Sequence, residues 1–211
     1  MSQTDQRRRR VLRAVAPVAG LLAAGLLVWQ GSYAAFSATT NNTADSWATG
    51  ALTLTNDAGT GVYAATTAAL FTEVAIKPGT TLAKCLTVQA GGTVGGALKF
   101  YRGAITGTNS VALAPQLTLT ITAMPAQAAN PGVTANCTNF VAAGAVSIAP
   151  GVALSALPTT YATGLGSMAI PVATRFIAYK ISYTFTSTGT NPGDNALQSS
   201  DAAADLSWEI Q

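Results

Sequence analysis

Few residues of this chain could do chemistry, and the residue type it lacks is the most informative. There is no histidine among the 211 residues, which removes the usual general base, the Ser-His and Cys-His nucleophile pairs and HExxH metal sites. Eight carboxylates remain. A glycan-cleaving pair such as Asp57 and Glu73 would need to face each other across the substrate, and nothing in the sequence brings these two together. We therefore expect no enzyme and no cofactor.

Few residues of the sequence could bind a metal ion. Two thiols without histidine cannot fill the tetrahedral shell of zinc. Loop oxygens suit Ca²⁺ better, and two sets qualify: Asp194, Asn195 and Asp201, or Asp45 and Asp57. Asp and Asn in loops also form turns and helix caps, and this simpler role is the one we expect here, with no metal site.

Cys85 and Cys137 are an even pair, which in an exported protein predicts a single structural disulfide. Such a bond would close a long loop and contribute about 4 kcal/mol by constraining the unfolded chain. Two buried free thiols are the alternative. Catalytic thiol chemistry would need a CxxC motif or a neighbouring base, and the sequence has neither.

The elements that must position these residues are predicted to be strands. Four segments alternate apolar and polar residues with a period of two, which is typical of strands that bury one face: residues 50–55, 116–123, 175–187 and 204–211. Shorter strands are predicted at residues 71–76, 81–88, 98–101 and 139–141. Pro, Gly and Asn turns separate them, and the alternation fades between residues 142 and 168. The pattern predicts an all-β sandwich.

Residues 1–35 have the pattern of an export signal. A basic stretch ends at Arg13, residues 14–28 carry no charge, and small residues follow at 31–35. The apolar run is short for a membrane span, although an uncleaved N-terminal anchor is the alternative, and the arginine run approximates a twin-arginine signal. Small-residue rules favour cleavage after Ala34. The mature protein is expected to leave the cytosol.

The net charge of +3 comes from this leader. From Phe36 onward there are six Lys and Arg against seven Asp and Glu, a net charge of 6 − 7 = −1. No basic patch with interleaved aromatic residues remains, so nucleic acid is not expected as a partner.

Several motifs of the chain resemble those of one family. They are WxGxYAxFSA at 29–38, WAxGxLxL at 47–54, IKPGTTL at 76–82, KCLTVQAGG at 84–92, and DN with LQ at 194–198. Together they resemble the TasA/camelysin-like exported proteins, from which the chain departs at Thr80, where Asp is usual, and at Ala90, where Asn is usual. The resemblance spans most of the chain and is weakest in the middle.

The resemblance implies a jelly-roll-like antiparallel β-sandwich and a leader removed by a dedicated SipW-type signal peptidase. Cleavage would then fall between Ala35 and Phe36. It also implies a structural subunit that assembles head-to-tail into extracellular fibres of the cell surface or biofilm matrix by donor-strand exchange with other copies of itself. The domains would be a helical signal peptide at 1–35, an extended arm and first strand at 36–55, and the sandwich at 56–211. The candidate donor residues are Phe36, Ser37, Ala38, Thr39, Thr40, Leu52 and Leu54. The protein would touch the membrane only through the leader. Camelysins carry an attribution of metallopeptidase activity, for which this sequence offers no residues.

A second hypothesis is a monomeric surface adhesin or carbohydrate-binding sandwich. Exposed aromatic residues such as Tyr63, Tyr101 or Tyr161 would form its stacking platform, although most aromatic residues of this chain are expected in the core.

Overall fold

The computed structural model describes residues 51–211, and the fold is discussed for these residues alone. The predicted signal peptide, the cleavage site at Ala35 and Phe36, and the arm residues Phe36–Thr40 lie outside them. No helix within 51–211 is both long enough and apolar enough to cross a membrane.

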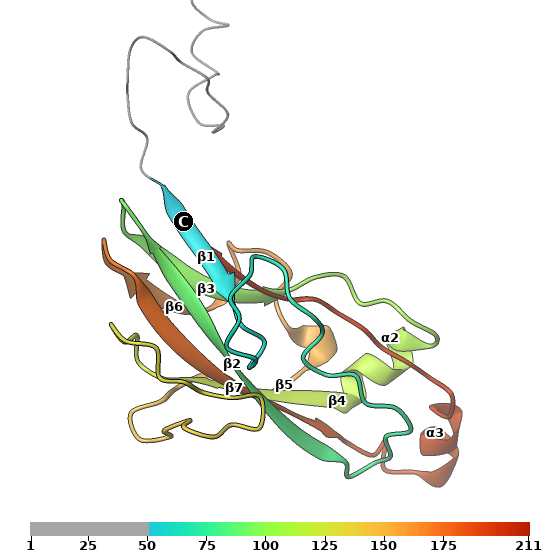
Figure 1. The fold of residues 1–211 in the computed structure, drawn as a ribbon. Helices are drawn as coiled ribbons and strands as arrows, with labels where there is room; N and C mark the ends of the chain where they lie inside the picture. Colours follow the sequence, from blue (N-terminus) through green and yellow to red (C-terminus); the bar gives the residue numbers. More distant parts are fainter. Residues whose placement is uncertain (1–50) are drawn as a thin grey trace, which may run out of the picture. The chain divides into compact units, whose positions relative to one another are not determined.

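Eight strands form two antiparallel sheets in a sandwich-like arrangement (Figure 1). Sheet A has the order β1-β2-β7-β4-β5, and sheet B has the order β6-β3-β8. The strands of sheet A are β1 Leu52–Asn56, β2 Thr81–Gly92, β4 Leu117–Ala123, β5 Val146–Ala153 and β7 Arg175–Phe185. Those of sheet B are β3 Gly96–Arg102, β6 Leu165–Ile170 and β8 Leu206–Ile210. The predicted all-β sandwich is thus confirmed at the level of its two sheets.

Residue alternation explains how the core forms. Along β7 the odd-numbered residues from Ile177 to Phe185 are buried, and along β4 so are Leu117, Leu119 and Ile121. These side chains, together with the inward residues of β2 and β3, make one hydrophobic core between the sheets. β4 shows the principle most clearly, because it buries one apolar face and leaves a Thr-rich face outside.

Short helical turns join some strands: α2 Ser110–Leu113, α3 Asn191–Ala196, and the 3₁₀ turns η1 Ala114–Gln116 and η2 Leu154–Ala156. α3 lies at one of the Asn, Pro and Gly stretches that separate the strands. This helix begins because the Thr190 hydroxyl accepts a hydrogen bond from the Gly193 amide and a proline occupies its first turn.

Two strand predictions were wrong, and one region was under-predicted. Residues 71–76 and 139–141 form no strand. Phe71, Ile76 and Phe140 pack on buried clusters without pairing in a sheet, while Val74 and Val141 are exposed. The stretch 142–168, expected to be irregular, contains β5 and the start of β6. Its alternation is interrupted because β5 pairs with β4 through two register shifts.

The predicted disulfide is confirmed. Cys85 and Cys137 are bonded with a Cα–Cα distance of 4.9 Å. Cys85 lies on the outer face of sheet A, because its neighbour Leu86 points into the core. There it packs with Met124 and Val133 in a second, smaller cluster. The disulfide therefore fastens the connection between β4 and β5 across the outside of sheet A.

Candidate strand-accepting site

The structure does not assemble the carboxylates that could have formed a catalytic pair. The Asp57 side chain is buried, and its Oδ1 accepts hydrogen bonds from the amides of Thr87 (2.7 Å) and Gly59 (2.9 Å). Glu73 instead pairs with Lys84 at 3.9 Å on the surface. The two carboxylates hold different segments in place.

The loop carboxylates act as turn formers. Asp194 accepts hydrogen bonds from the Ser187 hydroxyl (2.7 Å) and the Thr188 amide (2.7 Å), and the first of these contributes most to lowering its pKa. Asp201 accepts from the Thr108 amide, and Asn195 from Gln198. Within residues 51–211 no three acidic or cysteine side chains gather as metal ligands would.

The three tyrosines of the adhesin hypothesis do not share one surface. Tyr63 packs edge-on against Phe176, and its hydroxyl is buried. Tyr101 lies on the outer face of sheet B and donates to Glu209 at 2.7 Å, which raises its pKa. Tyr161 lies near this face, under the Lys99 ammonium, which is 4.7 Å from the centre of its ring. Only Tyr101 and Tyr161 belong to the same side.

The two sides of the sandwich differ in how their edge strands are built. On one side lie β5 and β6. β5 contains Pro150, which has no amide hydrogen, and pairs through register shifts, and the pairing of β6 with β3 also shifts register. Prolines and bulges are devices that prevent further strand pairing at an edge. We conclude that this side is protected against strand addition.

The other side is formed by β1 and β8, one edge strand from each sheet, which lie close together (Figure 1). Both pair with their neighbours in unbroken register. Ala97 and Gln211 exchange two backbone hydrogen bonds at the end of the β3–β8 ladder. Because such pairs alternate in antiparallel sheets, the backbone groups of Leu206, Trp208 and Ile210 point away from β3. No strand within 51–211 pairs with that side of β8.

An apolar groove of about 690 Å³ lies beside this edge. Its floor comes from core residues of sheet A, among them Leu86, Leu117 and Tyr183, and β8 contributes Leu206 and Trp208 to its wall. A groove of this size and lining can accept apolar side chains from an added segment. We call it the β8 groove.

Tyr183 lines the β8 groove, and its hydroxyl has unmet hydrogen-bonding capacity. The hydroxyl is buried and has no hydrogen-bond partner in the described part of the chain. Tyr183 is 8% exposed, and burial is the main cause of its raised pKa, with the charge of Glu73 adding to it. A backbone carbonyl brought within reach of this hydroxyl would supply the acceptor that it needs.

The groove is covered by residues 65–76, which we call the strap. The strap belongs to the connection between β1 and β2 and begins beside Ala64, which exchanges two backbone hydrogen bonds of 2.9 Å with Asn56. Its apolar residues Leu70, Phe71 and Ile76 pack against the core, and Phe71 meets Tyr183 edge-on at 5.3 Å. A connection of this length without secondary structure is uncommon in a compact domain and is often functional.

The structure places two of the candidate donor residues in the chain's own sheet. Leu52 and Leu54 lie on β1 and pair with Gly92 and Ala90 of β2. Leu54 also lines the β8 groove. The rest of the candidate donor segment lies outside the described residues.

The groove residues could not be singled out from the sequence. Trp208 and Tyr183 were expected only as core residues, and Phe71 as part of a strand. One signal was available: a long, almost uncharged stretch separates two strands that turn out to be adjacent.

No protein-family model matches the sequence, and no curated protein matches it significantly.

Proposed function

We propose that this protein is a secreted structural subunit that assembles head-to-tail into extracellular fibres, each copy inserting an extended segment beside β8 of the next. One observation carries the proposal: β8 is a regular edge strand that lies next to an apolar groove. Strand addition needs both features, because backbone hydrogen bonds provide affinity and side-chain pockets provide specificity.

The occupant we propose is a strand from a second copy, with residues 36–40 as the donor. Phe36, Ala38 and Thr40 would share one face of an extended segment. The phenylalanine would fill the groove, and the donor backbone would pair with Leu206, Trp208 and Ile210. A head-to-tail contact of this kind leads to a filament if its rotation does not close into a ring.

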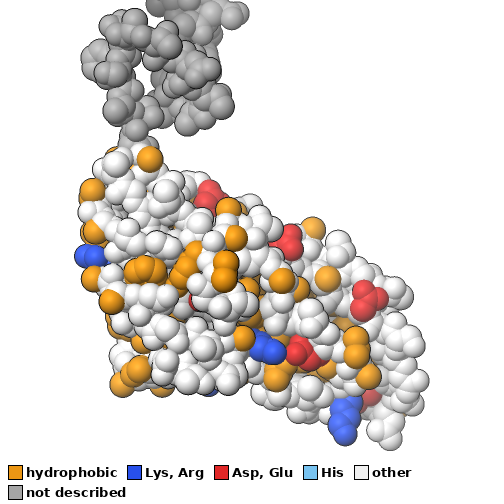
Figure 2. All heavy atoms as spheres, in the orientation of Figure 1, with side chains coloured by type: hydrophobic (Ala, Val, Ile, Leu, Met, Phe, Trp, Pro, Cys, Tyr) orange, Lys and Arg blue, Asp and Glu red, His pale blue; other side chains and the backbone are white. Residues whose placement is uncertain are grey.

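The surface chemistry is compatible with close stacking of copies. From Phe36 onward the chain has thirteen charged residues and a net charge of −1. In Figure 2 the visible face is mostly uncharged, with a few acidic and basic side chains. Little electrostatic repulsion therefore opposes association.

The proposal also covers where the protein is located and which kind of β-sandwich it forms. A structural disulfide such as Cys85–Cys137 is typical of oxidising, extracytoplasmic environments, which fits an exported protein processed by a dedicated signal peptidase at Ala35 and Phe36. We also propose a jelly-roll-like description, because the chain crosses between the sheets five times, at β2–β3, β3–β4, β5–β6, β6–β7 and β7–β8.

Electron microscopy of the purified protein tests the fibre hypothesis. We expect fibres that disappear when residues 36–46 are deleted, while circular dichroism shows that the sandwich stays folded. A protein that remains monomeric at high concentration and acidic pH would refute the proposal. N-terminal sequencing should find Phe36 as the first residue, and an intact leader would favour a membrane-tethered module.

A carbohydrate-binding adhesin is the second candidate. It is favoured by a group of side chains at the outer face of sheet B that combines two aromatic rings with one positive and one negative charge. These side chains are Tyr101, Tyr161, Lys99 and Glu209. A glycan array tests it directly. Binding that is lost in Tyr161→Ala and retained in Tyr63→Ala would support this function, whereas the absence of any glycan hit would exclude it.

A further inference from the structure

The edge strands are held by backbone hydrogen bonds to their neighbours, whereas the strap is held by its side chains. Between Ala65 and Ile76 no backbone–backbone hydrogen bond is formed with any other described residue. The pairing that starts between Asn56 and Ala64 stops after a single bridge. The strap therefore forms one wall of the groove with its side chains, and among the described residues it makes no backbone pairing with β8.

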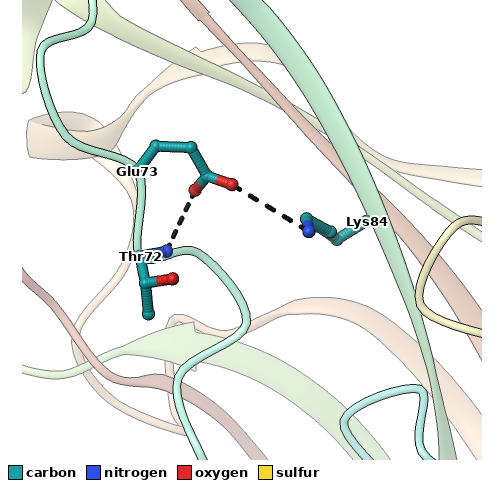
Figure 3. Close-up of polar contacts among 3 residues, drawn as sticks. All are labelled: Thr72, Glu73 and Lys84. Atoms are coloured by element: carbon teal, nitrogen blue, oxygen red, sulfur yellow. Dashed lines mark hydrogen bonds and ion pairs between the residues drawn. The ribbon is translucent and has the colours of Figure 1, made fainter.

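The strap is held by apolar packing and by two polar contacts. Leu70, Phe71 and Ile76 pack against the core. The Thr67 hydroxyl donates to the Asn56 side chain at 2.7 Å, and Glu73 reaches Lys84. Figure 3 shows Glu73 reaching from the strap toward Lys84 while also accepting from the Thr72 amide. Both charged side chains of the ion pair are about one-third exposed (32% and 30%), so solvent screens their attraction.

We propose that the strap is a displaceable cover: residues 65–76 close one side of the β8 groove in the monomer and move away when a strand of a second copy enters. This inference rests on the proposed function and adds a moving segment to it. The exchange is favourable because the incoming strand fills the open apolar groove and also pairs with the backbone of Leu206, Trp208 and Ile210. While the strap is in place, it limits uncontrolled pairing at an otherwise regular edge.

The exchange is tested with a fluorescent peptide of residues 36–46 and the purified protein. Phe71→Ala should increase the rate of peptide uptake by at least about tenfold, since truncating a packed phenylalanine usually costs more than the energy that corresponds to a factor of ten. Val74→Ala is the matched control, because Val74 belongs to the same strap but is 88% exposed. Its uptake rate should equal that of the wild type.

A second measurement on the wild type does not depend on the folding of a variant. Peptide uptake should expose the strap and so increase chymotrypsin cleavage after Phe71, while hydrogen exchange at Leu206, Trp208 and Ile210 slows. Peptide uptake or fibre formation with unchanged cleavage and unchanged Phe71→Ala kinetics would overturn the strap inference and leave the fibre function standing. If neither peptide uptake nor fibres are observed, both proposals fail.

Discussion

Replacing Tyr183 by phenylalanine should stabilise the monomer and weaken its assembly. The hydroxyl is buried without a partner among the described residues, whereas in the unfolded chain it is hydrated. An unsatisfied buried group of this kind costs about 1–3 kcal/mol. Phenylalanine keeps the ring that packs on Phe71 and removes the cost. We expect the free energy of unfolding to rise by about 1 kcal/mol, which raises Tm by about 2–4 °C in a domain of this size.

Tyr161→Phe is the matched control. Its hydroxyl donates to the backbone carbonyl of Ala97 at 2.7 Å, so its removal should lower the free energy of unfolding by about 1 kcal/mol. Both variants are measured by urea unfolding, with electron microscopy for assembly. Tyr183→Phe should form fibres more slowly, because the acceptor groove loses a donor. A Tyr183→Phe protein that is less stable than the wild type would refute the reasoning.

Three further predictions concern the rest of the fold. Replacing both Cys85 and Cys137 by alanine should lower the free energy of unfolding by about 4 kcal/mol, as measured by urea denaturation with the wild type in reducing agent for comparison. Asp194 has a pKa below its ordinary value of 3.8, so its stabilising effect is complete above that value and disappears as the pH falls through the lower, folded-state pKa. Acid titration followed by NMR should show its loop loosening in that range. Gly59→Ala should cost at least about 2 kcal/mol more than Gly61→Ala, because both glycines have positive φ but only at Gly59 would a Cβ lie 2.5 Å from backbone atoms of another segment.

Each of these three predictions has an outcome that would contradict it. Equal stability of the disulfide variant would mean that the closed loop is already constrained in the unfolded state. Loosening of the Asp194 loop that appears only as the pH rises would contradict the sign of the effect. Equal costs for the two glycine variants would mean that the neighbouring segment yields without loss.

Regular alternation made part of this fold predictable. The strands β1, β4, β7 and β8 were found from the sequence because apolar and polar residues alternate along each of them. In β4 and β7 the apolar residues are also the buried ones. β5 was missed because Pro150 and Gly151 interrupt its pattern. Residues 71–76 were predicted as a strand because side-chain composition does not tell whether a backbone partner exists.

The groove was beyond the reach of sequence patterns for a different reason. Its walls come from segments that are far apart in the chain, such as Leu54, Phe71 and Trp208. A period-two pattern reports which face of a strand is buried, but it does not report which edge of a sheet stays unpaired. The disulfide was predictable because only one pairing of two cysteines exists.

The contrast between the irregular side at β5 and β6 and the regular side at β1 and β8 has a consequence for the geometry of growth. Pro150 and the register shifts leave β5 and β6 poor templates for a further strand, so strand addition would be confined to the side of β1 and β8. With one donor strand beside β8 of each copy, linked copies would form a polar chain with distinct ends. Such a chain would lengthen by adding subunits at its tips.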